Sequence, residues 1–281
     1  MNLFPPDFTV GIISPAGKIK DEIFAFGTAA LQKLGAKVKI FPAACNAPAE
    51  FAYLAASDEL RAADIQAAFA DESVQLILAA RGGYGCARVL DMLDWDLLRK
   101  RRVMLAGFSD ITALHWAMCA QNAGIPVAAP MLKYLSDGDE FTLKHFFAAL
   151  RGEKLTLSLP SLNGGGKVQA LPLPGNLTVA ASLAGTPYFP DTTGKILILE
   201  DVTEIPYRLD RCLTQLRLAG AFRRCAAVVF GRFTRCGSEA EIMQLLQDFA
   251  GTVESPVFYD CPFGHEMPML SFNTSVPLEI K

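Results

Sequence analysis

The sequence predicts an α/β protein in which a parallel sheet, covered by helices on both faces, is followed by a second domain. Three observations support this prediction. Apolar runs with the length of strands alternate with helical segments in the first half of the chain, which is the pattern of a parallel sheet. The 281 residues match about two domains of ordinary size. Hydrophobic residues make up 51% of the chain and charged residues 20%, so packed cores are expected.

Five short apolar strands are expected in the first half, with four helices between them. Ser57 is the predicted N-cap of the second helix, because Asp58 and Glu59 follow it in the first turn. Gly35 and Gly124 stand where the first and fourth helices should end. The strands are expected at residues 9–14, 37–41, 74–80, 103–107 and 125–128, and the helices at residues 19–34, 57–70, 85–93 and 111–123.

A change in composition marks the predicted domain boundary. Residues 151–175 contain three consecutive glycines and several prolines, among them Pro172 and Pro174, which indicate a linker or a loop-rich entry to a second domain. The predicted domains are therefore residues 1–150 and 166–281. In the second domain, strands are expected at residues 195–200, 225–230 and 257–260, and helices at residues 207–218 and 239–249.

Charge and composition argue against several classes of partner. Lys and Arg number 26 against 29 Asp and Glu, so the net charge is −3, which does not favour binding to the phosphates of nucleic acid. No apolar run approaches the roughly 18 residues that a membrane helix needs. The three histidines and seven cysteines do not have the spacing of a zinc site. We therefore expect no nucleic acid, no membrane and no metal as partners.

The cysteines and the N-terminal residues indicate the compartment. The first basic residue is Lys18, so the charge order of a secretory signal is missing. The seven cysteines are odd in number and scattered, and several lie in apolar segments. Such residues are typical of free, buried thiols in a reducing environment. The sequence therefore predicts a cytoplasmic protein.

Ser109 is the first candidate for catalysis. In an open parallel sheet, ligands bind beyond the carboxyl ends of the strands, and Ser109 lies between the strand ending at Gly107 and the helix expected from Ile111. Such a turn presents a hydroxyl at a helix N-terminus and suits a nucleophile. The alternative is that Ser109 only caps the helix. The elbow pattern G-x-S-x-G is incomplete, because Ile111 replaces its second glycine.

A serine nucleophile needs a base, and the base needs an orienting carboxylate. His265 is the best placed histidine, because Gly264 permits close approach in its loop, CPFGHEMP, and two prolines fix the path of the chain. His115 and His145 lie in helical segments and are interpreted as packed residues. Glu200 closes an apolar strand, where it either reaches a histidine or is an ordinary acid facing water. If Ser109, Glu200 and His265 converge, an interdomain cleft is expected.

The turn Arg81-Gly82-Gly83-Tyr84-Gly85 follows another strand and allows several interpretations. Its glycines can leave backbone N–H groups free to hold a phosphate or an oxyanion, although no nucleotide-binding motif is complete here. It can also be an ordinary glycine-rich turn. Arg81 can pair with a substrate carboxylate or form a structural salt bridge.

Six motifs occur in order along nearly the whole chain. They are GIISPAG at 11–17, ARGGYG at 80–85, GFSDIT at 107–112, GNL at 175–177, LEDVTEIPYRLDR at 199–211 and FGHEMP at 263–268. These motifs resemble those of the LD-carboxypeptidase family of serine peptidases, which includes murein tetrapeptide carboxypeptidases and microcin-C immunity peptidases. One departure follows the last motif, where the family often has a Pro-x-Gly turn and this chain has Asn273-Thr274-Ser275.

The resemblance implies roles for five residues. Ser109 would be the nucleophile, His265 the general base and then acid, and Glu200 the carboxylate that orients His265. The backbone N–H groups of Gly83 and Asp110 would form the oxyanion hole.

The resemblance also implies a fold and a reaction. The fold is a Rossmann-like N-terminal domain with a smaller, β-rich α/β C-terminal domain, and family members are commonly homodimers. The reaction is hydrolysis of the L,D peptide bond that releases terminal D-alanine from cytoplasmic murein tetrapeptides, in peptidoglycan recycling. Neither a metal nor an organic cofactor is expected.

Two other functions remain open at this point. A related serine amidase would use the same triad to cleave a peptide–nucleotide conjugate. A non-catalytic protein that binds muropeptides would keep the two-domain site without covalent chemistry.

Overall fold

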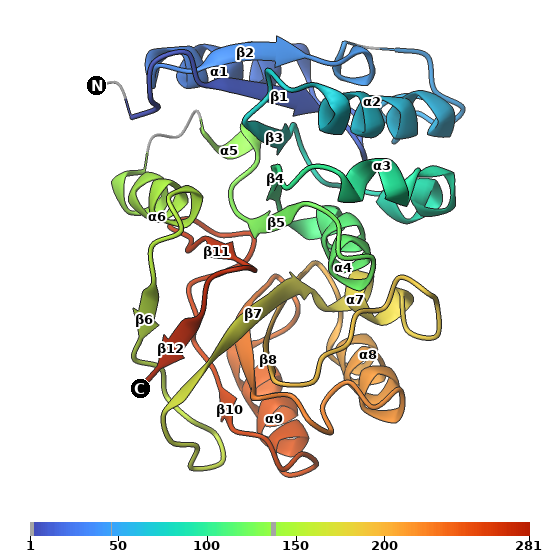
Figure 1. The fold of residues 1–281 in the computed structure, drawn as a ribbon. Coiled ribbons are helices and arrows are strands. Elements are labelled where there is room, and N and C mark those ends of the chain that lie inside the picture. Colours follow the sequence, from blue (N-terminus) through green and yellow to red (C-terminus); the bar gives the residue numbers. More distant parts are fainter. Residues whose placement is uncertain (1–2, 46, 136–138) are drawn as a thin grey trace.

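The computed structural model describes residues 3–45, 47–135 and 139–281, whose strands form two six-stranded sheets (Figure 1). The first sheet contains β1 (Thr9–Ile13), β2 (Lys37–Ile40), β3 (Leu76–Ala79), β4 (Met104–Gly107), β5 (Ile125–Ala128) and β11 (Phe272–Asn273). Its order is β11-β5-β4-β3-β1-β2. Strands β1 to β5 are parallel and β11 is antiparallel to β5. The predicted parallel sheet is thereby confirmed.

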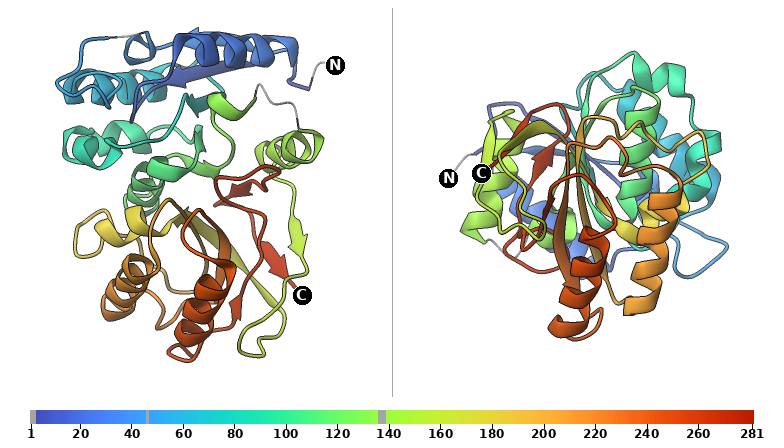
Figure 2. Two further views of the ribbon diagram at one scale, coloured as in Figure 1. Left: turned by 180° about the vertical axis from the view of Figure 1, so that it is seen from behind. Right: turned by 90° about the horizontal axis from the view of Figure 1, so that it is seen from below.

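Helices cover both faces of the first sheet (Figures 1 and 2). They are α1 (Asp21–Lys33), α2 (Asp58–Ala70), α3 (Trp95–Arg99), α4 (Thr112–Ala120), α5 (Leu132–Leu135), α6 (Glu140–Leu150) and the 3₁₀ helices η1 (Pro42–Ala44), η2 (Cys86–Met92) and η3 (Ser109–Ile111). Neighbouring strand residues enter different cores, because Ile13 packs with residues of α2 and α4 whereas Ile12 packs with residues of α1 and α6. This burial on both faces explains the continuous apolar runs.

Two details of the helix predictions can be compared with the structure. Ser57 caps α2 as predicted, since its Oγ accepts a hydrogen bond from the Leu60 N–H at 3.3 Å. The helix expected at residues 85–93 is the 3₁₀ helix η2, which starts with the Arg88 N–H bonded to the Gly85 carbonyl at 3.2 Å. The short helices α3 and α5 were not predicted, because a run of four or five residues is too short for helical periodicity to show.

The second sheet contains β6 (Leu155–Leu157), β7 (Val168–Asn176), β8 (Lys195–Val202), β9 (Ala227–Thr234), β10 (Val257–Phe258) and β12 (Leu278–Ile280). Its order is β10-β9-β8-β7-β12-β6, with β7 to β10 parallel to one another. Its helices are α7 (Leu177–Ser182), α8 (Pro206–Leu218) and α9 (Glu239–Ala250). Within the described residues, no helix combines the length and the apolar character that crossing a membrane requires.

The prediction that residues 151–175 form a loop-rich linker is wrong where β6 and most of β7 lie. Pro172 and Pro174 are part of β7, although proline cannot donate a ladder hydrogen bond. Strand β12 pairs only with residues 168–170 of β7. Among the described residues, the second half of β7 therefore has no strand partner on this edge, so its prolines interrupt no ladder of hydrogen bonds there.

The chain also passes between the two sheets more than once. Strand β6 precedes the predicted start of the second domain at residue 166 but joins the second sheet, and β11 from the C-terminal region joins the first sheet. The division into residues 1–150 and 166–281 stays a prediction.

Helix α4 connects the two sheets by packing against β7. The Trp116 Nε1–H donates to the Pro174 carbonyl at 3.0 Å, and the Asn176 N–H donates to Thr112 Oγ1 at 2.9 Å. A Cβ atom at Gly175 would lie 2.7 Å from Thr112 Cγ2 and 2.8 Å from Trp116 Nε1. Only glycine allows this approach, which sets the distance between the first sheet and β7.

His115 on α4 should make the protein less stable in acid. Its side chain is buried with Nε2 3.0 Å from the Leu105 carbonyl oxygen, and burial lowers the pKa of its imidazole to about 4. The unfolded chain, with an imidazole pKa of about 6.5, binds a proton in this interval that the folded chain does not. The free energy of unfolding should therefore fall by about 2–3 kcal/mol from this residue as the pH drops from about 7 to 4.5.

Urea unfolding of the wild type and of His115→Gln at several pH values measures this contribution. We expect the variant to lose less stability than the wild type over the same pH interval. Equal losses would show that His115 does not carry the effect.

Candidate active site

Ser109 lies on the turn between β4 and α4, at the start of η3, and its backbone is held in a rare conformation. Its φ is +64°, which costs a residue with a side chain about 1–2 kcal/mol. The neighbouring turn approaches it closely, since a Cβ atom at Gly82 would lie 2.9 Å from Ser109 Cβ and 3.0 Å from its Oγ. Ile111 packs on Gly107, where a Cβ atom would lie 2.9 Å from Ile111 Cγ1. The incomplete elbow pattern thus still forms a tight turn.

His265 bridges Ser109 and Glu200. Its Nε2 lies 2.9 Å from Ser109 Oγ and its Nδ1 lies 2.8 Å from Glu200 Oε2. When the neutral ring carries its proton on Nδ1, His265 donates a hydrogen bond to Glu200 and its Nε2 accepts one from the Ser109 hydroxyl. The structure therefore brings together three residues that the sequence separates widely. This is the arrangement in which a histidine can take a proton from a serine.

The loop that carries His265 is fixed by contacts to β9. The Arg232 N–H donates to the Phe263 carbonyl at 2.8 Å, and the Arg232 side chain donates to the Glu266 carbonyl at 2.7 Å and the Pro268 carbonyl at 3.0 Å. Gly264 has a φ of +143°, and a Cβ atom there would lie 3.2 Å from Glu200 Oε2. As the sequence suggested, this glycine allows the loop to approach the carboxylate closely.

Glu200 is completely buried at the end of β8. Burial raises the pKa of its carboxyl group, and the hydrogen bond from His265 opposes this shift. Its second oxygen, Oε1, accepts a bond from Asn176 Nδ2 at 3.3 Å. The alternative of a strand-end acid facing water does not apply here.

Asn176 is a site residue that the sequence analysis did not assign. Its Nδ2 also donates to Asp201 Oδ1 at 3.0 Å, and its Oδ1 caps α7 by accepting the Val179 N–H at 3.1 Å. Asp201 is further held by the Thr178 N–H at 2.9 Å. The Asn176 side chain thereby holds Oε1 of Glu200, the carboxylate oxygen that does not face His265. Its signals in the sequence were an Asn that can cap a helix and the motif GNL at 175–177, to which no role was assigned.

The turn at residues 81–85 and the turn at Ser109 each contain a backbone N–H group that is free of an acceptor among the described residues. Gly83 has a φ of +117°, and within the described part of the chain neither its N–H nor that of Asp110 has a hydrogen-bond acceptor. A Cβ atom at Gly82 would lie 3.4 Å from the Asp110 nitrogen. The two groups therefore belong to adjoining turns and are available to an oxygen of a ligand.

Arg81 bonds only to backbone carbonyl groups among the residues that the structure describes. Its Nε donates to Gly82 at 3.1 Å and its Nη1 to Lys18 at 2.9 Å. No carboxylate of the described residues forms an ion pair with it, so the structural salt bridge considered above is not found. Its Nη2 would lie 3.4 Å from a Cβ atom at Gly83, which places the guanidinium group against the turn.

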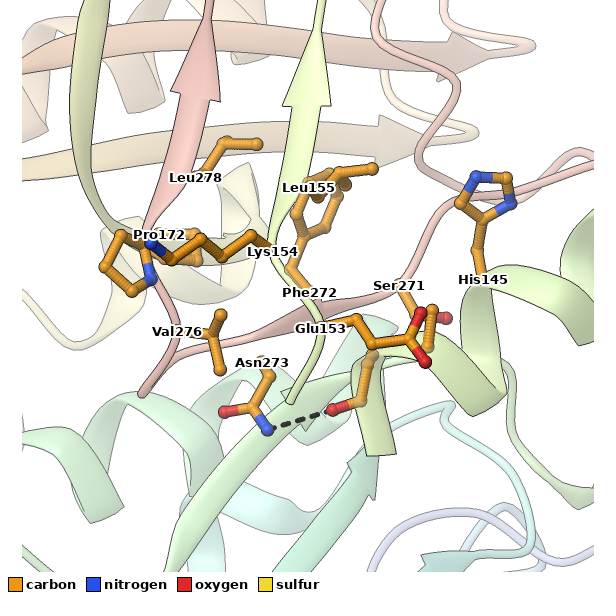
Figure 3. A pocket seen from close by; sticks show the side chains of 13 residues that line it. His145, Glu153, Lys154, Leu155, Pro172, Ser271, Phe272, Asn273, Val276 and Leu278 are labelled. Atoms are coloured by element: carbon orange, nitrogen blue, oxygen red, sulfur yellow. Dashed lines mark hydrogen bonds between the residues drawn. The ribbon is translucent and has the colours of Figure 1, made fainter. Parts of the chain in front are cut away.

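The other two histidines lie elsewhere. His115 is buried in α4, as described above. His145 on α6 bonds through Nδ1 to the Phe141 carbonyl of its own helix at 2.8 Å. It lines a small hollow of about 40 Å³ between α6, β6, β11 and β12, together with Ser271 and Asn273 (Figure 3). Both histidines are thus packed helical residues, as interpreted from the sequence. The expected interdomain cleft stays a prediction.

The chain is similar to known proteins over nearly its whole length. Residues 10–129 match the model of the LD-carboxypeptidase N-terminal domain, and residues 170–280 match that of the LD-carboxypeptidase C-terminal domain. The murein tetrapeptide carboxypeptidase of Pseudomonas aeruginosa is 30% identical over 93% of this chain and 89% of its own length.

Solved structures show the same fold. The muramoyltetrapeptide carboxypeptidase from Oxalobacter formigenes has a TM-score of 0.83 at 28% identity and covers 95% of this chain and 92% of its own. The microcin C7 self immunity protein MccF, solved with aspartyl sulfamoyl adenosine, has a TM-score of 0.87 at 21% identity and covers 99% and 94%. The second likeness concerns the fold alone.

The close approach of Gly82 to Ser109 yields a test of the site. We predict that Gly82→Ala slows labelling of Ser109 by a fluorophosphonate about 10- to 100-fold, because the added methyl group displaces Oγ from His265. Gly166→Ala is the matched control, since no atom lies within 4 Å of a Cβ there. Time courses by mass spectrometry measure the rate, and equal rates for both variants would contradict the prediction.

Proposed function

The chain belongs to the LD-carboxypeptidase family and is a serine carboxypeptidase, and from this premise we propose that it hydrolyses the L,D peptide bond that releases terminal D-alanine from murein tetrapeptides. The observation that carries the proposal is the series of contacts from Ser109 through His265 to Glu200, at 2.9 and 2.8 Å. The name of the Pseudomonas aeruginosa relative supports this substrate class.

In the proposed reaction, Ser109 Oγ attacks the scissile carbonyl carbon while His265 Nε2 takes the hydroxyl proton. His265 then gives this proton to the nitrogen of D-alanine, the C–N bond breaks, and an ester to Ser109 remains. A water molecule attacks the ester after passing a proton to His265, and that proton returns to Ser109 as the shortened peptide leaves. Glu200 holds the Nδ1–H and stabilises the imidazolium in both steps.

The Gly83 and Asp110 N–H groups are the proposed donors to the oxyanion. Their support is that both are free of other acceptors in the described structure and lie on turns that meet at Ser109. Removal of one such donor costs about 10²- to 10³-fold in rate in other enzymes.

Arg81 is proposed to bind the terminal carboxylate of the substrate. A carboxypeptidase has to distinguish a free chain end from an internal peptide, and a guanidinium group pairs well with a carboxylate. The support is its position against the Gly83 turn without a carboxylate partner among the described residues.

The cellular setting is part of the proposal. We place the enzyme in the cytoplasm, as a homodimer that acts in peptidoglycan recycling, with the domains at residues 1–150 and 166–281. The seven cysteines form no disulfide, which agrees with a reducing compartment. The family resemblance supports the dimer.

The triad proposal predicts the effect of two substitutions. Ser109→Ala should abolish release of D-alanine from a purified murein tetrapeptide, and Glu200→Gln should lower kcat by about 10²- to 10⁴-fold because His265 loses its orienting charge. Ser182→Ala, at an exposed serine on α7, is the control. Liquid chromatography with mass spectrometry measures the products.

The same assay separates the alternatives. Retained turnover by Ser109→Ala would overturn the triad. Faster cleavage of a peptide–nucleotide conjugate than of the tetrapeptide by the wild type would favour the amidase. Tight muropeptide binding without fluorophosphonate labelling would favour a binding protein.

The role of Arg81 predicts a dependence on the substrate's chain end. Arg81→Gln should raise KM for a tetrapeptide about 10- to 100-fold, because a charged hydrogen bond is lost. It should leave the slower turnover of the C-terminally amidated tetrapeptide unchanged. Arg99→Gln, on α3, is the control. An equal loss of activity of Arg81→Gln on the free and the amidated tetrapeptide would contradict the assignment.

A further inference from the structure

Arg61 on α2 is an arginine with no exposed surface. Its guanidinium group donates to the Pro15 carbonyl and, at 2.9 Å, to the Gly85 carbonyl, while its Nε donates to the Ala56 carbonyl at 3.2 Å. Asp58, one helical turn earlier, forms an ion pair with it. Each of the three nitrogens of the planar group therefore has a defined partner.

The three carbonyl groups belong to three different loops. Pro15 follows β1, Gly85 follows β3, and Ala56 precedes α2. These loops are also joined directly, by the Gly17 N–H to the Gly82 carbonyl at 3.1 Å and the Ala55 N–H to the Ala16 carbonyl at 3.0 Å. Arg61 thus lies at the point where the loops around the carboxyl ends of β1 and β3 meet.

The glycine at residue 85 is explained by this contact. Its φ is +132°, and a Cβ atom there would lie 2.8 Å from Arg61 Nη1 and 2.8 Å from Leu54 Cδ2. The backbone therefore rests directly on the guanidinium group. The next residue is held from the opposite side, because the Cys86 N–H donates to the buried Asp110 carboxylate at 2.9 Å.

The turn that carries Gly82 and Gly83 is thereby fixed at its C-terminal end by a side chain from α2 and a side chain from η3. Burying an arginine carries a large desolvation cost, which well-packed apolar residues would avoid. Stability alone therefore does not account for a charged group here. The planar set of N–H donors of Arg61 instead fixes the position of three loops relative to Ser109.

We infer that Arg61 is a positioning residue, which holds the Gly83 N–H where the oxyanion forms next to Ser109. This inference rests on the proposed function. The oxyanion develops only after Ser109 attacks, so a displaced donor weakens binding of the transition state and not of the substrate. Loss of Arg61 should therefore lower kcat and leave KM nearly unchanged.

The test compares Arg61→Gln and Arg61→Lys with a matched control. Arg101→Gln is that control, because Arg101 donates to the carbonyl groups of Asp71 at 2.5 Å and Phe69 at 3.4 Å near the opposite, amino end of β3. The measurements are the melting temperature, kcat and KM for a tetrapeptide, and the rate of fluorophosphonate labelling of Ser109, which also passes through an oxyanion.

We expect Arg61→Gln to lower kcat and the labelling rate about 10²-fold, with KM within about 3-fold of the wild type. The kcat and labelling rate of Arg61→Lys should lie between those of the wild type and Arg61→Gln, because one ammonium group reaches fewer carbonyl groups. If Arg61→Gln does not fold, Arg61→Lys serves as the test. Arg101→Gln should have a lower melting temperature than the wild type and an unchanged kcat.

Three outcomes would overturn the inference. They are a folded Arg61→Gln with wild-type kcat, a rise in KM without a fall in kcat, and an equal fall in kcat for Arg101→Gln. A wild type that labels at Ser109 but does not cleave the tetrapeptide would overturn the proposed substrate and leave the labelling comparison to decide on Arg61. A wild type that does not label would overturn the catalytic proposal and the role of Arg61 with it.

Discussion

Helix α4 packs against strand β7 with no side chain between them at Gly175, and this contact holds the two parts of the site together. The turn that carries Ser109 leads directly into α4, while β7 pairs with β8 so that Asn176 lies opposite Glu200. The path from Ser109 to Glu200 therefore runs through one helix and two hydrogen-bonded strands, all within a single hydrophobic core. Because such cores are close-packed, the spacing of Ser109 and Glu200 is set by packing.

Some features could be predicted from neighbouring residues alone. The strands β1, β3, β4 and β5 are largely buried on both faces, so their apolar runs are easily recognised. Ser109, Glu200 and His265 each stand at a strand end or in a stiff loop, which made them candidates. Their joint role came from the resemblance to a family, since no local pattern shows that residues so far apart in the chain will meet.

Other features depend on contacts that a sequence does not display. Pro172 and Pro174 indicated a linker because proline is rare in paired strands. The sequence does not show that this half of β7 has no strand partner on one edge within the described chain, which depends on where β12 ends. Asn176 has the appearance of an ordinary helix cap, and its bond to Glu200 requires the register of β7 and β8. Arg61 lies in a helix that also contains Asp58, Glu59 and Asp64, and an arginine in such a helix usually faces water. Each of these residues acquires its role from partners in another part of the fold.

The path of the chain after β10 has a consequence for how the protein is made. The segment leaves the second sheet, passes through His265, adds β11 beside β5 in the first sheet, and returns as β12. A ribosome therefore releases the Ser109 turn long before His265, the residue proposed to activate it. Throughout this interval, the nascent polypeptide carries the Ser109 hydroxyl without its proposed base, and under the proposed function hydrolytic competence arrives only when the final strands close both sheets.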